Sequence, residues 1–190
     1  MDKANNPFVT RGFGDSASWL DLVNSELWDG FGNFSDMLDD PAWINGFMKF
    51  WKFRVPIEPF PSREFKALRK LIRHVVQQAE SKGQVHMEHL EMLNEWFKVP
   101  SILRLVEDQN GLRLAMSADR ERGGWPTVLA NIASGFAQSL VEQEHKRFKI
   151  CSNEDCKWVF LDRTRGNVRR WCSNATCGNR ARVRKARAGK

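Results

Sequence analysis

Four cysteines are the residues of this chain whose type and spacing most directly indicate chemistry. Cys151 and Cys156 form one pair, Cys172 and Cys177 form a second pair, and the 190-residue sequence contains no other cysteine. Four residues separate the members of each pair, and fifteen residues separate the pairs. Two cysteine pairs joined by a short spacer match a tetrahedral four-thiolate zinc site, although two intervening residues are commoner than four. The pattern therefore predicts one structural Zn²⁺ ion bound by all four thiolates.

Two disulfide bonds are the alternative interpretation of the same cysteines. Residues 1–7 lack the apolar segment of a secretory signal, so we expect a reducing compartment, which favours zinc. Residues 151–177 have few large aliphatic side chains, and a bound metal adds on the order of 10 kcal/mol to the folding of such a segment. A closed four-thiolate site leaves no coordination position for a substrate, so we expect structural ligands and not nucleophiles.

Positive charge is concentrated around these cysteines. Residues 145–190 contain 14 Lys and Arg but three Asp and Glu, whereas residues 1–144 contain 16 basic and 20 acidic residues. The net charge of +7 therefore comes from the last quarter of the chain. This asymmetry predicts a polyanion-binding module on a mildly acidic body, with a solvated basic tail as the alternative. The predicted nucleic-acid contacts are Arg163, Arg165, Arg169, Arg170, Asn179, Arg180, Arg182, Arg184, Lys185 and Arg187.

A hairpin and a helix are the elements expected to position these residues. Residues 157–162 predict a strand, residues 163–167 a turn that contains glycine, and residues 168–172 the returning strand. A helix is expected to begin near Cys177 and to continue to about Ala188. The order of knuckle, hairpin and helix is that of a treble-clef-like finger.

The predicted last helix groups its cations by face. Arg180, Arg184 and Arg187 fall at positions i, i+4 and i+7 and share one face, while Arg182 and Lys185 share a neighbouring face. Cations that neutralise phosphates release counterions, which makes affinity depend on salt. Arginine also makes bidentate contacts with phosphate or with guanine. The helix is therefore expected to bind DNA; RNA stays an alternative, because a basic finger does not itself choose between the two polymers.

Asn179 and Trp171, next to these cations, have two interpretations each. Asn179 either caps the start of the helix, which we favour, or contacts a base. Trp171 either packs over the zinc site, which we favour, or stacks on a base. Arg169 and Arg170 point to opposite faces of the predicted strand, so at most one of them is expected to contact the ligand. Because a module of about 40 residues buries little DNA surface, selective binding is expected to need a homodimer or another partner.

Residues 1–144 predict a mainly helical body. Asp40 and Pro41 supply the N-cap and first position of one helix, and three prolines in residues 55–61 exclude regular structure there. Ser62 is the expected cap of a longer helix that ends before Gly83. The residues expected to be buried are Trp19, Leu20, Leu22, Val23 and Leu27 in a helix capped by Asp15; Ile44, Phe47, Met48 and Trp51 after Pro41; Phe65, Leu68, Leu71, Ile72, Val75, Val76 and Ala79 after Ser62; and Leu90, Leu93, Trp96 and Phe97 within residues 85–98.

One β-hairpin and a final helix complete the body. Residues 101–107 and 112–117 are short apolar runs joined by a segment that contains Asn110-Gly111, a hairpin turn signal. A helix is expected from Trp125 onward, because large apolar residues then recur every four positions. The predicted fold class is α+β. A mainly helical N-terminal domain with a β-hairpin, residues 1–147, precedes a C-terminal treble-clef-like four-cysteine zinc finger, residues 148–190.

The sequence around the last two cysteines resembles a known family. The string from Cys172 to Arg180, preceded by Arg169-Arg170-Trp171, resembles the CGNR zinc finger, which is named for the tetrapeptide at residues 177–180. The likeness covers about residues 148–188. Residues 8–145 are similar, more loosely, to the helical ABATE domain that accompanies this finger. The resemblance implies a bacterial stress-induced transcription regulator whose finger binds DNA and whose N-terminal domain senses a small-molecule effector or mediates association.

Other classes of function receive little support from the sequence. No stretch of about 18 apolar residues occurs, so no membrane span is expected and a cytoplasmic, nucleoid-associated protein is predicted. No phosphate-binding loop or catalytic triad is present, so the chain is not expected to be an enzyme. His86 and His89 lie at metal-binding spacing, but a charged helix face explains them better. An interaction scaffold, in which the finger docks onto the acidic body or onto a protein partner, is the second functional hypothesis.

Overall fold

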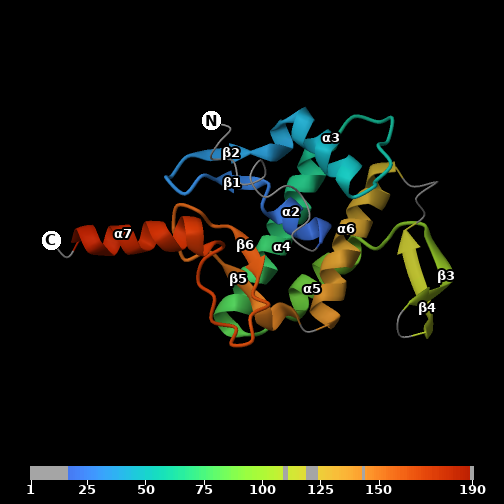
Figure 1. Ribbon diagram of the computed structural model, residues 1–190. Helices are drawn as coiled ribbons and strands as arrows, with labels where there is room; N and C mark the ends of the chain where they lie inside the picture. The colour runs from blue at the N-terminus through green and yellow to red at the C-terminus, as the bar shows by residue number, and fades with distance from the viewer. Residues whose placement is uncertain (1–16, 109–110, 119–123, 143, 189–190) are drawn as a thin grey trace.

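Three helices pack together at the centre of the protein. The computed structural model describes residues 17–108, 111–118, 124–142 and 144–188. Helix α2 (Ser18–Val23) contacts α4 (Ser62–Lys82) and α6 (Gly124–Val141), and α4 also contacts α6. Helices α3 (Pro41–Phe50) and α5 (Met87–Glu95) lie around this centre, and α7 (Asn179–Ala188) extends away from it (Figure 1). None of the described helices combines the length and apolar character needed to span a bilayer.

Within the described residues, three small antiparallel sheets lie around the helices, so the predicted α+β class is confirmed. Their strands pair as β1 (Glu26–Trp28) with β2 (Phe34–Asp36), β3 (Ser101–Asp108) with β4 (Gly111–Ala118), and β5 (Phe148–Ile150) with β6 (Val159–Leu161). The short helices are the 3₁₀ segments η2 (Met37–Asp39) and η3 (Glu144–Arg147) and the π-helix η4 (Asn174–Gly178). Each sheet consists of two strands and lies at the outside of the helical centre.

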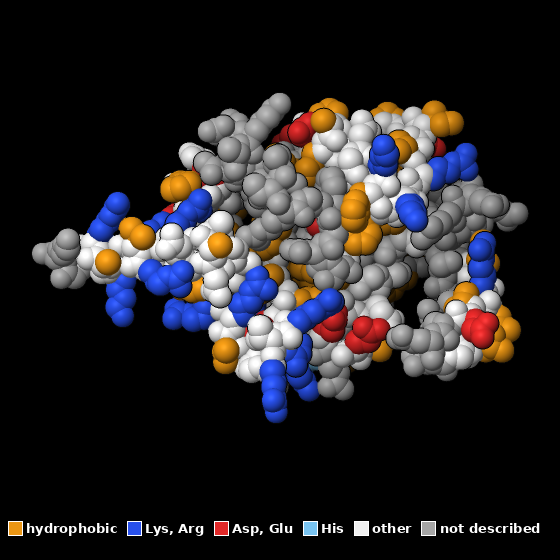
Figure 2. Space-filling model, in the orientation of Figure 1, with side chains coloured by type: hydrophobic (Ala, Val, Ile, Leu, Met, Phe, Trp, Pro, Cys, Tyr) orange, Lys and Arg blue, Asp and Glu red, His pale blue; other side chains and the backbone are white. Residues whose placement is uncertain are grey.

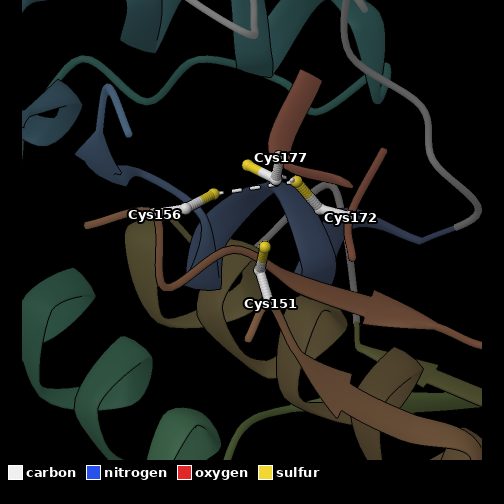
Figure 3. A group of neighbouring side chains, drawn as sticks. All are labelled: Cys151, Cys156, Cys172 and Cys177. Atoms are coloured by element: carbon white, nitrogen blue, oxygen red, sulfur yellow. Dashed lines mark hydrogen bonds between the residues drawn. The ribbon is translucent and has the colours of Figure 1, made fainter. Parts of the chain in front are cut away.

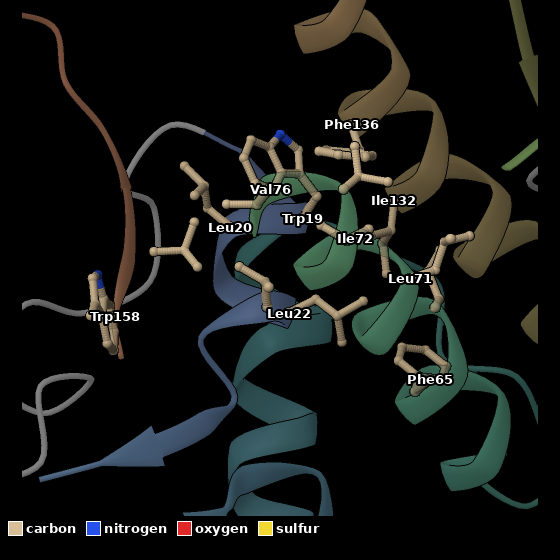
Figure 4. Close-up of a cluster of buried hydrophobic side chains, with 14 of the residues drawn as sticks. Trp19, Leu20, Leu22, Phe65, Leu71, Ile72, Val76, Ile132, Phe136 and Trp158 are labelled. Carbon is tan, nitrogen blue, oxygen red and sulfur yellow. The ribbon is translucent and has the colours of Figure 1, made fainter. Parts of the chain in front are cut away.

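The hydrophobic core contains residues from both ends of the sequence (Figure 4). Trp19 is fully buried, and its ring centroid lies 5.0 Å from that of Phe136 and 5.3 Å from that of Phe148. The Trp19 indole N–H donates to the Ser139 hydroxyl at 3.3 Å. Because Phe148 belongs to β5, which precedes the first cysteine, one buried cluster includes side chains of both the body and the cysteine-rich segment.

The sequence patterns of α3 and α4 predicted these helices well. All seven apolar residues expected on the inner face of α4 are buried. Gly83 ends α4 in the left-handed conformation with φ +66°, as its position predicted. Asp40 caps α3 by accepting a hydrogen bond from the Ala42 N–H at 2.9 Å, and Pro41 is the first helical residue. Local capping chemistry therefore fixed these boundaries.

Other boundaries differ from the sequence predictions. Ser62 lies inside α4, and Pro61 occupies the cap position, so the predicted serine cap is wrong. Leu27 belongs to β1 and not to the first helix, because α2 ends at Val23 and the chain turns there into a strand. In the fourth predicted helix Leu93 is buried, whereas Leu90, Trp96 and Phe97 pack against the core only in part. The predicted cap at Asp15 lies outside the described residues.

The predicted hairpin of the body is confirmed in strands β3 and β4. Ser101 pairs with Ala118 at one end, and Asp108 pairs with Gly111 at the other. Residues 109–110 of the expected turn lie outside the described residues. The hairpin extends to one side of the helical centre (Figure 1), and Leu103 and Leu105 on β3 are exposed.

A buried ion-pair cluster joins the β1–β2 hairpin to α4. Arg69 is 4% exposed, and its guanidinium donates to both carboxylate oxygens of Asp36 at 2.6 and 2.8 Å. Arg73 lies 2.9 Å from the carboxylate of Glu26, on β1. Burial alone would raise the pKa of Asp36, but the hydrogen bonds and charge of Arg69 lower it below its usual value. The cluster fixes the hairpin against α4 through paired charges.

Acid is expected to remove the contribution of Asp36 to stability. Because folding lowers the pKa of Asp36, its contribution is complete above the unfolded value of about 4 and is lost as pH falls through the folded value. We expect Asp36→Asn to be less stable than the parent protein at pH 7, and we expect this difference to shrink as pH falls below about 4. Urea unfolding of both proteins across this pH range measures the difference in stability. Loss of the metal at low pH affects both proteins and therefore cancels in the difference. A stability gap that is independent of pH would contradict the prediction.

Candidate metal centre and basic surface

The four cysteine side chains converge on one point (Figure 3). All four are buried, none of them forms a disulfide bond, and their sulfur atoms lie within 4.8 Å of one another. Two of the sulfur–sulfur distances, from Cys172 to Cys156 and to Cys177, are 3.7 Å. A tetrahedron with Zn–S bonds of about 2.3 Å has edges of about 3.8 Å. The donor set and its geometry therefore fit a structural zinc ion, and the alternative of two disulfide bonds is not what the structure has.

The electrostatics of the cluster also favour a bound cation. Hydrogen bonds from Cys156 and Cys172 lower the pKa of Cys151 to about 7, and the three neighbouring cysteines lower the pKa of Cys177 as well. Hydrogen bonds with the other cysteines raise the pKa values of Cys156 and Cys172, so the four sulfurs conflict: two favour the thiolate and two favour the thiol. A divalent cation removes this conflict by stabilising all four thiolates together.

Backbone hydrogen bonds place the cysteines. The Cys151 N–H, just after β5, donates to the Trp158 carbonyl at 2.9 Å, and the Cys156 N–H donates to the Asn153 carbonyl at 2.8 Å. Cys177 lies in η4, where the Ser173 hydroxyl caps the turn by accepting from the Thr176 N–H at 3.3 Å. Ser173, and not Asn179, therefore supplies the side-chain cap, and Asn179 is exposed.

Two contacts support the sulfurs, and the first of them was not predicted from the sequence. The side-chain amide of Asn153, which is 5% exposed, donates to the Cys177 sulfur at 3.7 Å and so orients a ligand from outside the coordination shell. A Cβ at Gly178 would lie 3.1 Å from Cδ1 of Trp171, so the indole packs directly against this glycine. Trp171 is partly buried, which confirms that it packs beside the cysteine cluster.

The predicted hairpin between the cysteine pairs is wrong in its pairing. Strand β6 pairs with β5, in the register Phe148 with Leu161, and residues 168–172 form no strand. Asp162 explains the difference, because its fully buried carboxylate accepts from the N–H groups of Thr164 and Arg169 at 2.9 and 2.7 Å. These bonds hold Arg169 at the end of β6 through a side chain and not through strand pairing, and β5 is the strand that pairs with β6.

Several of the predicted nucleic-acid contacts bind other parts of the protein. The Arg169 guanidinium donates to the carbonyls of Trp171 and Cys172 and lies 4.5 Å above the ring of Phe160, so it supports the metal site. Arg184 forms an ion pair with Asp155. Because residues 168–172 form no strand, the expected division of Arg169 and Arg170 between two strand faces does not apply.

Two further predicted contacts also have partners within the chain. The Arg180 guanidinium donates to the Asp29 carbonyl at 3.0 Å. Arg163, whose side chain is 63% exposed, lies 3.6 Å from the Glu144 carboxylate. An exposed and long ion pair of this kind contributes little to stability, so Arg163 stays accessible to another anion.

The remaining predicted cations form an exposed basic surface. Figure 2 shows Lys and Arg side chains along α7 and around the cysteine-rich segment. Every residue of α7 keeps at least part of its side chain exposed. We define the basic surface by its exposed cations, Arg165, Arg170, Arg182, Lys185 and Arg187.

The cysteine-rich segment is fastened to the body by specific bonds. The buried side-chain amide of Asn24 bonds to both backbone groups of Val159, donating to the carbonyl at 2.9 Å and accepting from the N–H at 2.8 Å. Glu80 accepts from the Ile150 N–H at 2.9 Å, and the Lys157 ammonium lies 3.9 Å above the ring of Trp28. The Asn24 side chain thus bonds to the backbone of β6 as a neighbouring strand would, and it joins the cysteine-rich segment to the helical body.

The other candidate groups have simpler explanations. His89 stacks on His74 with ring centroids 5.5 Å apart, and among the described residues the four cysteines are the one group with metal-binding geometry. Trp19, Trp43 and Trp125 are buried in the core. A surface cavity of about 230 Å³ lies between residues 53–58 and the start of α6, and no tryptophan lines it. These three tryptophans are therefore core residues and do not line the cavity.

Comparison with known protein families matches almost all of the described chain. A model of the ABATE family, described as "Putative stress-induced transcription regulator", matches residues 16–143. A model of the CGNR zinc finger family matches residues 147–190. No curated protein matches the sequence.

Proposed function

The chain belongs to the ABATE family and ends in a CGNR zinc finger, and from this premise we propose that it regulates transcription by binding DNA through the basic surface of that finger. The observation that carries the proposal is the placement of the cations. Arg182, Lys185 and Arg187 lie exposed on a helix that extends away from the body (Figure 1). A nucleic acid can therefore approach α7 without contact with the helical centre.

The dimensions of α7 suit a DNA groove. Its ten residues make a rod of about 15 Å, and the major groove, about 12 Å wide, accepts an α-helix. Asn179 is exposed at the start of this helix, where it can reach a base edge. The zinc ion supplies no chemistry beyond structure in this proposal: it fixes η4, and thereby the first turn of α7.

Charge repulsion within α7 also favours an anionic partner. Arg182 and Lys185 are three residues apart, as are Arg184 and Arg187, so like charges are neighbours on the helix surface. Phosphates bound along the helix neutralise these charges and release counterions. The helix is thus stabilised by the polymer that it is proposed to bind.

Removing the three outer cations tests the proposal. We expect the variant with Arg182, Lys185 and Arg187 all changed to Gln to bind duplex DNA roughly 100-fold more weakly, and the slope of log K against log salt to fall by about 2.7. Fluorescence anisotropy titrations at several salt concentrations measure both quantities. The matched control changes three exposed cations of the body, Lys49, Arg54 and Arg63, to Gln and is expected to bind as the parent does.

Three results would contradict the proposal. Equal losses of DNA affinity in the two triple variants would indicate that DNA responds only to the total charge of the protein. Duplex or structured RNA that displaces the DNA at equal concentration would assign the surface to RNA. A parent protein that binds neither polymer would favour the scaffold hypothesis.

A further inference from the structure

The turn between β1 and β2, residues 29–33, is held by two parts of the zinc finger. The Gly30 N–H donates to the Asp155 carbonyl at 2.9 Å, next to the first cysteine pair. The Arg180 guanidinium donates to the Asp29 carbonyl at 3.0 Å and lies 4.0 Å above the ring of Phe31. The first turn of α7 is therefore bonded to a body segment about 150 residues earlier in the chain.

Gly30 is the residue that lets the guanidinium approach so closely. Its φ is +83°, and a Cβ built there would lie 1.9 Å from Nη1 of Arg180. Gly32 has a similar φ of +95°, but the nearest atom to its Cβ would be an Asp155 oxygen at 4.0 Å. Both glycines thus adopt a positive φ that disfavours other residues. Of the two, only Gly30 is a position where an added side chain would collide with Arg180.

We propose that Arg180 is a positioning residue that fixes the direction of α7 relative to the body, and that the β1–β2 turn is the contact through which the body holds this helix. This inference rests on the proposed binding of nucleic acid by α7. No residue of the described helix is buried, so its direction depends on η4, on the Arg184–Asp155 ion pair and on Arg180. Arg180 is the partly buried member of these two arginines, with both a hydrogen bond and a ring contact.

The inference separates Arg180 from the phosphate-binding cations. A residue that positions the helix lowers the cost of ordering it on DNA, so its loss weakens binding without changing the number of phosphates neutralised. A residue that binds phosphate contributes about 0.9 to the salt slope. Loss of a direct contact therefore changes both the affinity and the salt slope, whereas loss of a positioning residue changes the affinity alone.

The pair Gly30→Ala and Gly32→Ala provides the test with its matched control. The new methyl group at residue 30 displaces the end of the flexible Arg180 side chain, whereas the methyl group at residue 32 lies 4.0 Å from its nearest atom, an Asp155 oxygen. We expect Gly30→Ala to bind duplex DNA about tenfold more weakly with an unchanged salt slope, and Gly32→Ala to bind as the parent does. Zinc content of one ion per chain in both variants verifies that the metal site persists.

Arg180→Gln supplies a second, independent variant. It is expected to match Gly30→Ala in affinity and slope, and the double variant to be no weaker than either single one, because both changes remove the same contact. Equal binding by Gly30→Ala and Gly32→Ala would overturn the inference, as would a fall of about 0.9 in the slope of Arg180→Gln.

Hydrogen exchange of the free protein tests the same contact without nucleic acid. Gly30→Ala and Arg180→Gln are expected to speed amide exchange both in residues 29–33 and in the first turn of α7, whereas Gly32→Ala leaves α7 unchanged. Unchanged exchange in α7 for both former variants would refute the positioning role even where DNA binds. A parent protein that fails to bind DNA refutes the proposed function, while the exchange data still decide whether Arg180 holds the helix.

Discussion

Cys177→Ser is expected to lower the zinc content from one ion per chain to near zero and to abolish binding to DNA. The four sulfurs share one buried cluster, so a missing thiolate leaves three ligands and a hydroxyl in place of a closed site. Zinc contributes on the order of 10 kcal/mol to the folding of small four-ligand modules, and η4 and α7 have no other core of their own. Metal analysis of the purified protein and DNA titration measure the two losses.

The same substitution is also expected to weaken the body. Phe148, Trp158 and Phe160 of the finger lie in the same buried cluster as the central helices, so a loosened finger exposes part of that core. Thermal unfolding of the parent protein with and without a chelator should reproduce the effect of the variant. Ser152→Ala, a change of an exposed residue beside Cys151, is the matched control and should retain its zinc. Full zinc occupancy in Cys177→Ser would contradict the assignment of this ligand.

Arg69→Met is expected to destabilise the body by about 3 kcal/mol, because the Asp36 carboxylate loses both hydrogen bonds from the guanidinium and keeps Lys66, at 3.3 Å, as its charged partner. The Asp36 side chain is 12% exposed, so little water can replace the guanidinium. Arg69 also donates to the Ser25 hydroxyl at 2.9 Å, so the substitution breaks a second buried bond. Urea unfolding at pH 7 measures the loss of stability.

Two companion variants make the Arg69 experiment specific. Lys70→Met removes a charge of the same sign from the exposed neighbour on α4 and should change the free energy of unfolding by less than about 0.5 kcal/mol. Combining Arg69→Met with Asp36→Leu removes both charges and should recover part of the loss. Equal stability of Arg69→Met and the parent protein would show that the cluster contributes no net stability.

Sequence reasoning succeeded where the deciding interactions are local. The inner stripe of α4 follows from a spacing of three and four residues, and the caps at Asp40 and Gly83 act within one turn of their helices. The cysteine spacing predicted the metal site for the same reason, because each pair closes a short loop around the ion. The hairpin of β3 and β4 likewise depends on a turn between adjacent strands.

The sequence did not predict contacts in which a strand or a polar side chain bonds to a partner that is distant in the sequence. The strand β6 required an antiparallel partner, and the nearest segment in sequence, residues 168–172, was the natural expectation. The Asp162 carboxylate instead accepts from the Arg169 N–H of that segment, and β5 pairs with β6. Nothing in the local pattern of Asn24 indicated that its amide would bond to both backbone groups of Val159, 135 residues later.

The amino-acid sequence by itself determined the metal ligands, the helical body and the excess of positive charge at the end of the chain. The tertiary structure alone decided which of those charges are available. Arg169 and Arg180 have the same side chain as Arg187, which is exposed, yet the first two meet backbone carbonyls and aromatic rings inside the protein. The physical reason is that a guanidinium charge is a property of the residue, whereas its neutralisation depends on acceptors that the fold brings within about 3 Å.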